Sequence, residues 1–306
     1  MRTDSDGSNS QRGIALALAS AAAFGTNIVS AQIAGMAGLS GPLLVFYRVF
    51  VMLALVGGVI LLWRSGLSVP RRRWPALILF GLSTGLVGSA YLSSVAFLPV
   101  TVAAVVFYTF PVLVVLAEPL LTRTRPRLER IVVVLVAFLG VAMVVGPDWH
   151  GLDPRGLALA LLASVAAAVQ FFAAGALGET GTLPKLFWSH LMILPVTFLI
   201  LLLTGGMQPP GALALAPIAV LVTIGGYLVG FLWQVLALAR VAPGPAALAF
   251  CAEPVFAVVI AAAVLGERVG MLQYAGGGLV VAAIMVNVIL EQKRMRASKL
   301  ALAPPT

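Results

Sequence analysis

The chain has 306 residues, of which 61% are hydrophobic and only 9% are charged, and its net charge is +9. Soluble globular domains carry roughly 25% charged residues, so this chain has too few to cover a water-facing surface and its composition indicates a membrane protein. Continuous apolar runs such as 43–63 predict membrane-spanning helices, because the strands of a membrane barrel would alternate apolar and polar residues.

In chain order, a polar segment over 1–12 precedes ten predicted spans. It has no short apolar region followed by a small-residue cleavage site, so we expect no cleaved signal peptide. The expected spans are 13–34, 43–63, 75–96, 102–121, 131–147, 156–176, 185–204, 213–237, 245–265 and 271–290. The predicted fold is an all-α membrane protein with tails over 1–12 and 291–306, five-helix units over 13–147 and 156–290, and an outer connection over 148–155.

The positions of the basic residues predict the orientation, since short cytoplasmic loops are rich in Lys and Arg. With the N-terminus inside, 16 of the 19 basic residues fall in inner segments, Arg155 and Arg268 fall in outer loops, and Arg48 lies within the second span. We therefore expect a multi-pass protein of the cell inner membrane with both termini in the cytoplasm. The same distribution explains the net charge without a nucleic-acid partner.

Side chains suited to metal or nucleophilic chemistry are scarce. The single cysteine, Cys251, excludes an internal disulfide and a cysteine cluster for zinc, and two histidines, His150 and His190, are too few for a His-rich metal site. The sequence contains no GxxxxGK[ST], HExxH or GxSxG motif. We expect no metal, no cofactor, no enzymatic activity and no direct use of ATP.

The second five spans repeat the first. The run Gly13–Leu18 resembles Gly156–Leu161 (156 − 13 = 143), and Pro111 matches Pro254 at the same offset. Because five crossings are an odd number, the second copy enters the membrane from the opposite side. The sequence therefore predicts inverted repeats around a central cavity, an arrangement typical of secondary transporters. The alternative is a duplicated scaffold without a pathway.

These features resemble the drug/metabolite transporter superfamily, of the EamA type. The resemblance rests on five plus five helices, on Pro111 and Pro254, and on the turn 265–268 (Leu-Gly-Glu-Arg) followed by three glycines at 276–278. The first half departs from it, with Arg123-Thr124-Arg125 in the turn. The resemblance implies that helices one to four and six to nine surround the cavity. It also implies transport of amino acids, nucleotide sugars, sugar phosphates or drugs; many bacterial members are similar to amino-acid exporters, one group to exporters of aromatic amino acids.

Two ionisable residues inside the spans are the leading candidates for function. Glu253 lies near the centre of the ninth span, where an ionised carboxylate costs a few kcal/mol unless it is protonated, paired or wetted. It fits proton coupling, binding of a substrate amine, or a structural hydrogen bond. Arg48 stays charged at membrane depth. It fits binding of a substrate carboxylate, pairing with an acid, or snorkelling to the outer interface about 8 Å away.

Weaker candidates complete the set. Glu118, near the inner end of the fourth span, predicts an interfacial salt bridge with Arg123 and Arg125, and His190 fits a packing or a pathway role equally. Asn27 with Gln170 and Tyr91 with Gln234 are symmetric pairs that fit a cavity or, alternatively, interhelical hydrogen bonds worth about 0.6–2 kcal/mol each. The remaining pathway candidates are Tyr108, Trp188, Phe107 and Phe250, with Pro111 and Pro254 as expected helix breaks.

The predicted function is that of a secondary transporter that exports amino acids or related metabolites by alternating access. The driving force is the gradient of the solute itself or of protons. The alternatives are a drug or nucleotide-sugar transporter of the same fold, a membrane-embedded enzyme, and a scaffold that moves nothing. The expected partners are a small solute, the lipid bilayer and protons.

Overall fold

The computed structural model describes residues 3–146, 152–178 and 180–301, and in these ranges it contains helices and no strand. The helices are α1 (Thr3–Met36), α2 (Gly41–Trp63), α3 (Trp74–Ser94), α4 (Val100–Phe107), α5 (Phe110–Thr122), α6 (Leu128–Val145), α7 (Pro154–Ala176), α8 (Thr182–Leu203), α9 (Pro217–Leu238), α10 (Pro243–Phe250), α11 (Glu253–Leu265) and α12 (Met271–Ala301). Two short 3-10 helices, η1 (Arg71–Arg73) and η2 (Pro210–Leu215), precede α3 and α9.

Ten apolar spans are long enough to cross a membrane, which confirms the predicted all-α fold. Their ends lie within four residues of the expected ones. The fourth span contains α4 and α5 and the ninth contains α10 and α11, and the two interruptions lie just before Pro111 and Pro254, the expected helix breaks. The described parts of the two predicted tails are helical and belong to α1 and α12, while residues 147–151 of the expected outer connection lie outside the described residues.

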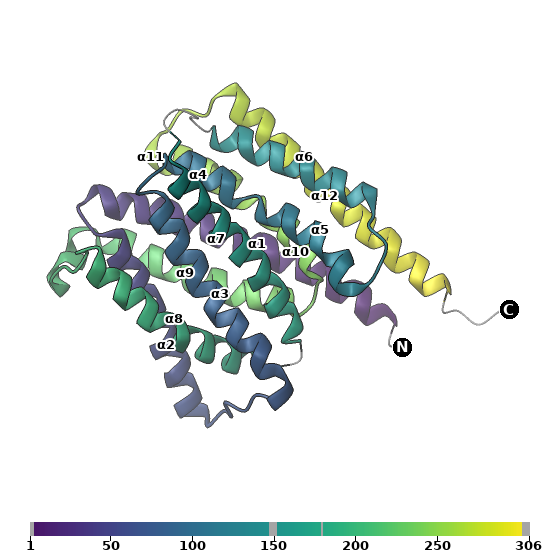
Figure 1. The fold of residues 1–306 in the computed structure, drawn as a ribbon, viewed down its shortest axis with the longest axis horizontal. Helices are drawn as coiled ribbons and strands as arrows, with labels where there is room; N and C mark the ends of the chain where they lie inside the picture. Colours follow the sequence, from purple (N-terminus) through teal and green to yellow (C-terminus); the bar gives the residue numbers. More distant parts are fainter. Residues whose placement is uncertain (1–2, 147–151, 179, 302–306) are drawn as a thin grey trace.

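The two halves cross each other through matching helix pairs. α1 of the first half packs against α9 of the second, and their counterparts α7 and α3 pack against each other in the same way. α2 packs against its own counterpart α8, and α6 packs against its counterpart α12. Figure 1 shows α6 and α12 side by side along one edge of the bundle. Each pairing therefore maps onto another pairing, or onto itself, when the halves are exchanged, which is the property of two copies related by a two-fold axis. With five spans in each half, the second copy crosses in the opposite direction.

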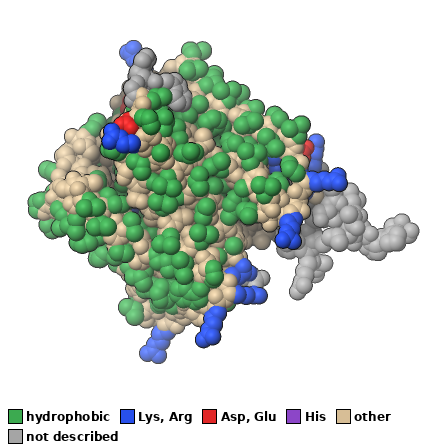
Figure 2. Space-filling view, in the orientation of Figure 1, with side chains coloured by type: hydrophobic (Ala, Val, Ile, Leu, Met, Phe, Trp, Pro, Cys, Tyr) green, Lys and Arg blue, Asp and Glu red, His purple; other side chains and the backbone are tan. Residues whose placement is uncertain are grey.

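The two ends of the bundle differ in charge. α1 begins and α12 ends at the same end (Figure 1), which also carries the connections α2–α3, α5–α6 and α9–α10 with most of the basic residues. We call it the basic end. Figure 2 shows a broad hydrophobic surface with Lys and Arg at its margins. Leu61, Leu62 and Leu120 are among its highly exposed apolar side chains, which suits contact with lipid rather than with water.

The turn after the fourth span differs in sequence but not in conformation from its counterpart. Gly266 follows α11 with φ 69°, and Arg123 follows α5 with φ 52°. Both residues are left-handed helix caps, although a side chain is disfavoured there by roughly 1–2 kcal/mol. The first half thus keeps the turn of the second despite the departure of its sequence.

Glycines set the separation of α6 and α12. A Cβ added at Gly276 would lie 2.6 Å from the Gly140 backbone oxygen, whereas a Cβ added at Gly278 would meet no atom within 4 Å. We therefore expect Gly276→Ala to destabilise the protein by about 1–3 kcal/mol through overpacking. The control Gly278→Ala should be neutral or stabilising by up to about 1 kcal/mol, because alanine favours helix. Thermal unfolding in detergent measures both, and equal melting temperatures would contradict the expectation.

Candidate functional site

The fourth and ninth spans break near the middle of the membrane at equivalent residues. Each break is explained by proline, which has no N–H to bond to the carbonyl four residues earlier. α10 ends at Phe250, four residues before Pro254, and α4 ends at Phe107, four residues before Pro111. Interrupted helices at this depth expose backbone dipoles to the interior and mark solute sites in many transporters.

Glu253 is the first residue of α11, directly after the break. The N-terminus of a helix carries a partial positive charge, which favours a carboxylate. Tyr108 and Arg48 are the polar side chains near the Glu253 carboxyl group, and no ion pair joins Glu253 to either of them among the described residues. Gly25 of α1 packs against its backbone, since a Cβ there would lie 3.1 Å from the Glu253 carbonyl oxygen. The carboxylate thus lies where α1 and the breaks of both halves meet.

Arg48 points into the bundle, which rules out snorkelling to the outer interface as one of its three alternatives. Its guanidinium carbon lies 4.5 Å from the centre of the Tyr227 ring, and its Nη1 donates to Asn27 Oδ1 at 3.2 Å. Its Nε is buried and has no hydrogen-bond partner. The ion pairs among the described residues join Arg130, Arg155 and Arg294 to acids and do not include Arg48 with Glu253. An unmet donor and an unpaired carboxylate therefore face the same interior.

His190 makes contacts that fit the packing alternative. It is 0% exposed, with Nδ1 2.8 Å from the Leu186 carbonyl oxygen and Nε2 3.0 Å from the Tyr227 hydroxyl. Because a carbonyl oxygen only accepts, Nδ1 carries the proton and Nε2 accepts from Tyr227. Both ring nitrogens are therefore satisfied, and the histidine joins α8 to α9 beneath the Arg48 guanidinium.

The symmetric amides Asn27 and Gln170 make equivalent bridges between the halves. Asn27 Nδ2 donates to the Thr223 carbonyl oxygen at 2.5 Å, which ties α1 to α9. Gln170 Nε2 donates to Thr84 Oγ1 at 2.8 Å, which ties α7 to α3. The structure thus favours interhelical hydrogen bonding for both. Asn27 has a second role, because its oxygen holds Arg48.

Aromatic rings form a continuous chain through the breaks. Tyr91 contacts Phe107, Phe107 contacts Phe110, Phe110 contacts Phe171 and Phe171 contacts Phe250, with ring centres 5.2–5.4 Å apart. Tyr108 packs on the same chain. Gln234, the counterpart of Tyr91, is buried in α9. The interior beside Glu253 is therefore largely apolar and aromatic.

Comparison with a protein-family model identifies the family of this chain. The model of the EamA-like transporter family matches the chain twice, over residues 11–146 and 154–289. The chain belongs to the EamA-like transporter family. Each match covers one five-span half, and the two matches begin 143 residues apart, the offset of the sequence repeat. As an EamA-like transporter, the chain is a multi-pass membrane protein that moves small solutes.

Other comparisons add the fold. The EamA-like chain superposes on a solved structure described only as "Crystal structure of protein", with a TM-score of 0.71 and 20% sequence identity. The superposition covers 89% of this chain and 98% of the other. At that identity the likeness supports the fold alone. No curated protein matches the chain.

Two candidate residues of the transporter lie apart from the breaks. Trp188 donates its Nε1–H to the Leu67 carbonyl oxygen at 3.2 Å and packs against Trp74 at the basic end. Glu118 does form a salt bridge, but its partner is Arg130 at 3.4 Å rather than Arg123 or Arg125. The left-handed conformation of Arg123 reverses the chain after α5, which brings α6 and Arg130 back beside Glu118.

Sequence reasoning missed several residues of the aromatic and polar interior of the transporter. Phe110 is the counterpart of Glu253, and Phe171 adjoins Gln170, so the repeat register was a usable signal for both. Thr84 and Thr223, which accept the amide hydrogen bonds, carried no such signal. Two hollows bounded by described residues lie elsewhere, between α11 and α12 and beside α5 and α6. The central cavity stays a prediction.

Proposed function

We propose that this transporter exports amino acids or closely related metabolites by alternating access, with its basic end in the cytoplasm. The solute site we infer lies between Arg48 and Glu253. The observation that carries this inference is the buried, unpartnered Nε of Arg48. A buried donor without a partner costs about 1–3 kcal/mol, and a bound solute carboxylate would remove that cost.

Glu253 supports the same assignment for the other end of the solute. An amino acid carries an ammonium group and a carboxylate on one carbon atom, so it needs one cation and one anion close together. Among the described residues no ion pair joins Arg48 to Glu253. Both side chains therefore remain free to bind a zwitterion, and a zwitterion that bridges Arg48 and an ionised Glu253 leaves no net charge buried.

The aromatic chain supports an apolar side chain on the solute. Phe107, Phe171 and Phe250 line the region beside the breaks, and rings of this kind bind apolar and aromatic groups by stacking and edge contacts. Proton coupling through Glu253 is a further part of the proposal.

A ligand screen tests the proposal. We expect amino acids with large apolar side chains to raise the melting temperature of the purified protein, because a ligand of the native state stabilises it by mass action. Their decarboxylated amines and their N-acetyl derivatives should raise it less, since each lacks one of the two charges. Sugars and nucleotide sugars complete the plate. A rise with nucleotide sugars and none with amino acids would sink the amino-acid proposal in favour of the alternative cargo.

A further inference from the structure

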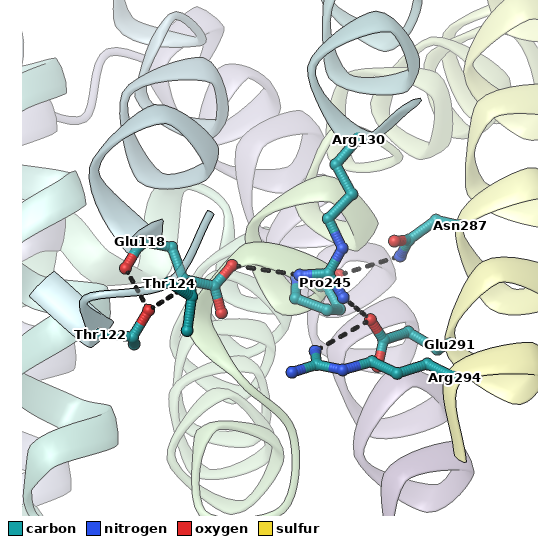
Figure 3. Close-up of polar contacts among 8 residues, drawn as sticks. All are labelled: Glu118, Thr122, Thr124, Arg130, Pro245, Asn287, Glu291 and Arg294. Atoms are coloured by element: carbon teal, nitrogen blue, oxygen red, sulfur yellow. Dashed lines mark hydrogen bonds and ion pairs between the residues drawn. The ribbon is translucent and has the colours of Figure 1, made fainter. Parts of the chain in front are cut away.

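A group of charged residues joins four helices at the basic end. Arg130 of α6 pairs with Glu118 of α5 at 3.4 Å and also contacts the Glu291 carboxylate of α12, as Figure 3 shows. The side chains of Arg130 and Glu118 are 13% exposed and that of Glu291 is 9% exposed, while Arg294 approaches Glu291 from outside at 3.9 Å. These pairs are too enclosed to count as screened surface pairs, and loss of one partner leaves a buried charge behind.

The same group holds the beginning of α10. Gly244, the second residue of α10, is buried directly under Glu118, so that a Cβ at this position would overlap the carboxylate. On the other side Asn287, one turn before Glu291 on α12, donates to the Pro245 carbonyl oxygen at 3.5 Å (Figure 3). Contact between α5 and α10 joins one half to the other at the basic end.

The opposite end lacks this closure. α10, which occupies the basic half of the ninth span, buries residues 244–250 without interruption, whereas α11 in the other half buries only Pro254 and Ala261. Within the described residues α5 and α10 pack together more extensively than their counterparts α11 and α4 do. The positions equivalent to Glu118 and Arg130 are Ala261 and Gln273. A hollow of about 520 Å³ lies beside Gln273 between α11 and α12, and it is larger than the hollow of about 280 Å³ beside Glu118 and Arg130.

We propose that Glu118, Arg130, Glu291 and Gly244 form a gate, the basic-end lock, which holds the transporter closed at the basic end and favours the state that opens at the other end. The symmetric fold would make two opposite states similar in energy. Among the described residues an ion pair that joins the two halves is present at the basic end alone, and it removes that balance. The proposal rests on alternating access, since a lock has a function only where both ends open in turn.

The native cysteine provides a test. Cys251 is the single cysteine of the sequence, is 0% exposed, and lies at the break where α10 ends. Its labelling by a membrane-impermeant maleimide, added from one side of oriented vesicles, reports opening from that side. We expect Arg130→Gln to raise labelling from the basic side by about fivefold or more, the range of typical coupling energies, and to lower labelling from the other side.

A second variant reaches the lock by a different route. Gly244→Ala keeps every charge but places a methyl group against Glu118, so it should shift labelling in the same direction. Arg125→Gln is the matched control, because Arg125 is an exposed arginine of the α5–α6 connection outside the lock. Gel filtration identifies any variant that fails to fold. If Arg130→Gln fails to fold, Gly244→Ala still tests the lock.

The outcomes separate the lock from the proposed function. The lock alone is overturned if Cys251 is labelled in Gly244→Ala and in folded Arg130→Gln at the same rates as in the wild type and in Arg125→Gln. In that outcome an added amino acid still changes the labelling of the wild type. Faster labelling of the wild type from the basic side than from the other side also overturns the lock, because the lock favours the state that opens at the other end. A shift in both variants and none in Arg125→Gln supports the lock even if the solute proves not to be an amino acid.

Discussion

Arg48→Gln should weaken the binding of amino acids by about 10–100-fold while it leaves their decarboxylated amines almost unaffected. A hydrogen bond to a charged group is worth about 1.5–3 kcal/mol, and each 1.4 kcal/mol changes the dissociation constant tenfold. The Nε–H of Arg48 has no hydrogen-bond partner among the described residues. A bound solute carboxylate would accept this hydrogen bond in the wild type and would lose it in Arg48→Gln. Counterflow in proteoliposomes and calorimetric titration measure the change.

Two further variants sharpen this prediction. Arg48→Lys keeps the charge but not the forked donors that fit a carboxylate, and it should recover only part of the affinity. Arg64→Gln, at the exposed end of the same helix, is the control for charge alone. Equal losses for an amino acid and for its decarboxylated amine in Arg48→Gln would mean that Arg48 only holds Asn27 and Tyr227 in place.

Glu253→Gln is expected to abolish most solute flux and any dependence of that flux on pH that originates at this carboxylate. The amide has nearly the shape of the acid and can still face the Tyr108 hydroxyl, but it cannot attract an ammonium group or exchange a proton. The substitution would also remove the acidic group near Arg48 and leave the positive charge of Arg48 unbalanced at the solute site. Transport assayed from pH 5 to pH 8 tests both parts.

Tyr108→Phe accompanies Glu253→Gln as a milder change. It removes a neighbour of the carboxylate and leaves the charge, so the maximal rate should fall less than in Glu253→Gln and the pH dependence should persist. A Glu253→Gln protein that transports at the rate of the wild type, with the same pH profile, would assign Glu253 to a structural hydrogen bond. A melting temperature close to the wild type is required before either result is interpreted.

The spans and the repeat could be predicted from the sequence because they depend on length, hydropathy and register alone. The direction in which Arg48 points could not. In a membrane protein both the lipid-facing and the buried faces of a helix are apolar, so the pattern of α2 does not say which face is inside. Only packing against Tyr227 and Asn27 decides it.

The broken helices mark a different limit. Pro111 and Pro254 were recognised, but the interruption of each helix lies two or three residues earlier, where the released carbonyl and the next turn have to be accommodated. Whether a proline bends a span or divides it depends on the neighbours that take up the freed backbone groups. The partner of Glu118 was missed for a related reason, since sequence proximity favoured Arg123 and Arg125 over Arg130.

The contact of Gly140 with Gly276 restricts how the two halves can move. Their backbones touch at one register, and a shift of α12 by one turn would put Leu272 or Val280 in the place of Gly276, where a Cβ would lie 2.6 Å from the Gly140 backbone oxygen. The α6–α12 edge therefore permits a pivot and forbids a longitudinal slip. Any exchange between the two open shapes that preserves this edge must be a rocking motion with the glycine pair as its fulcrum.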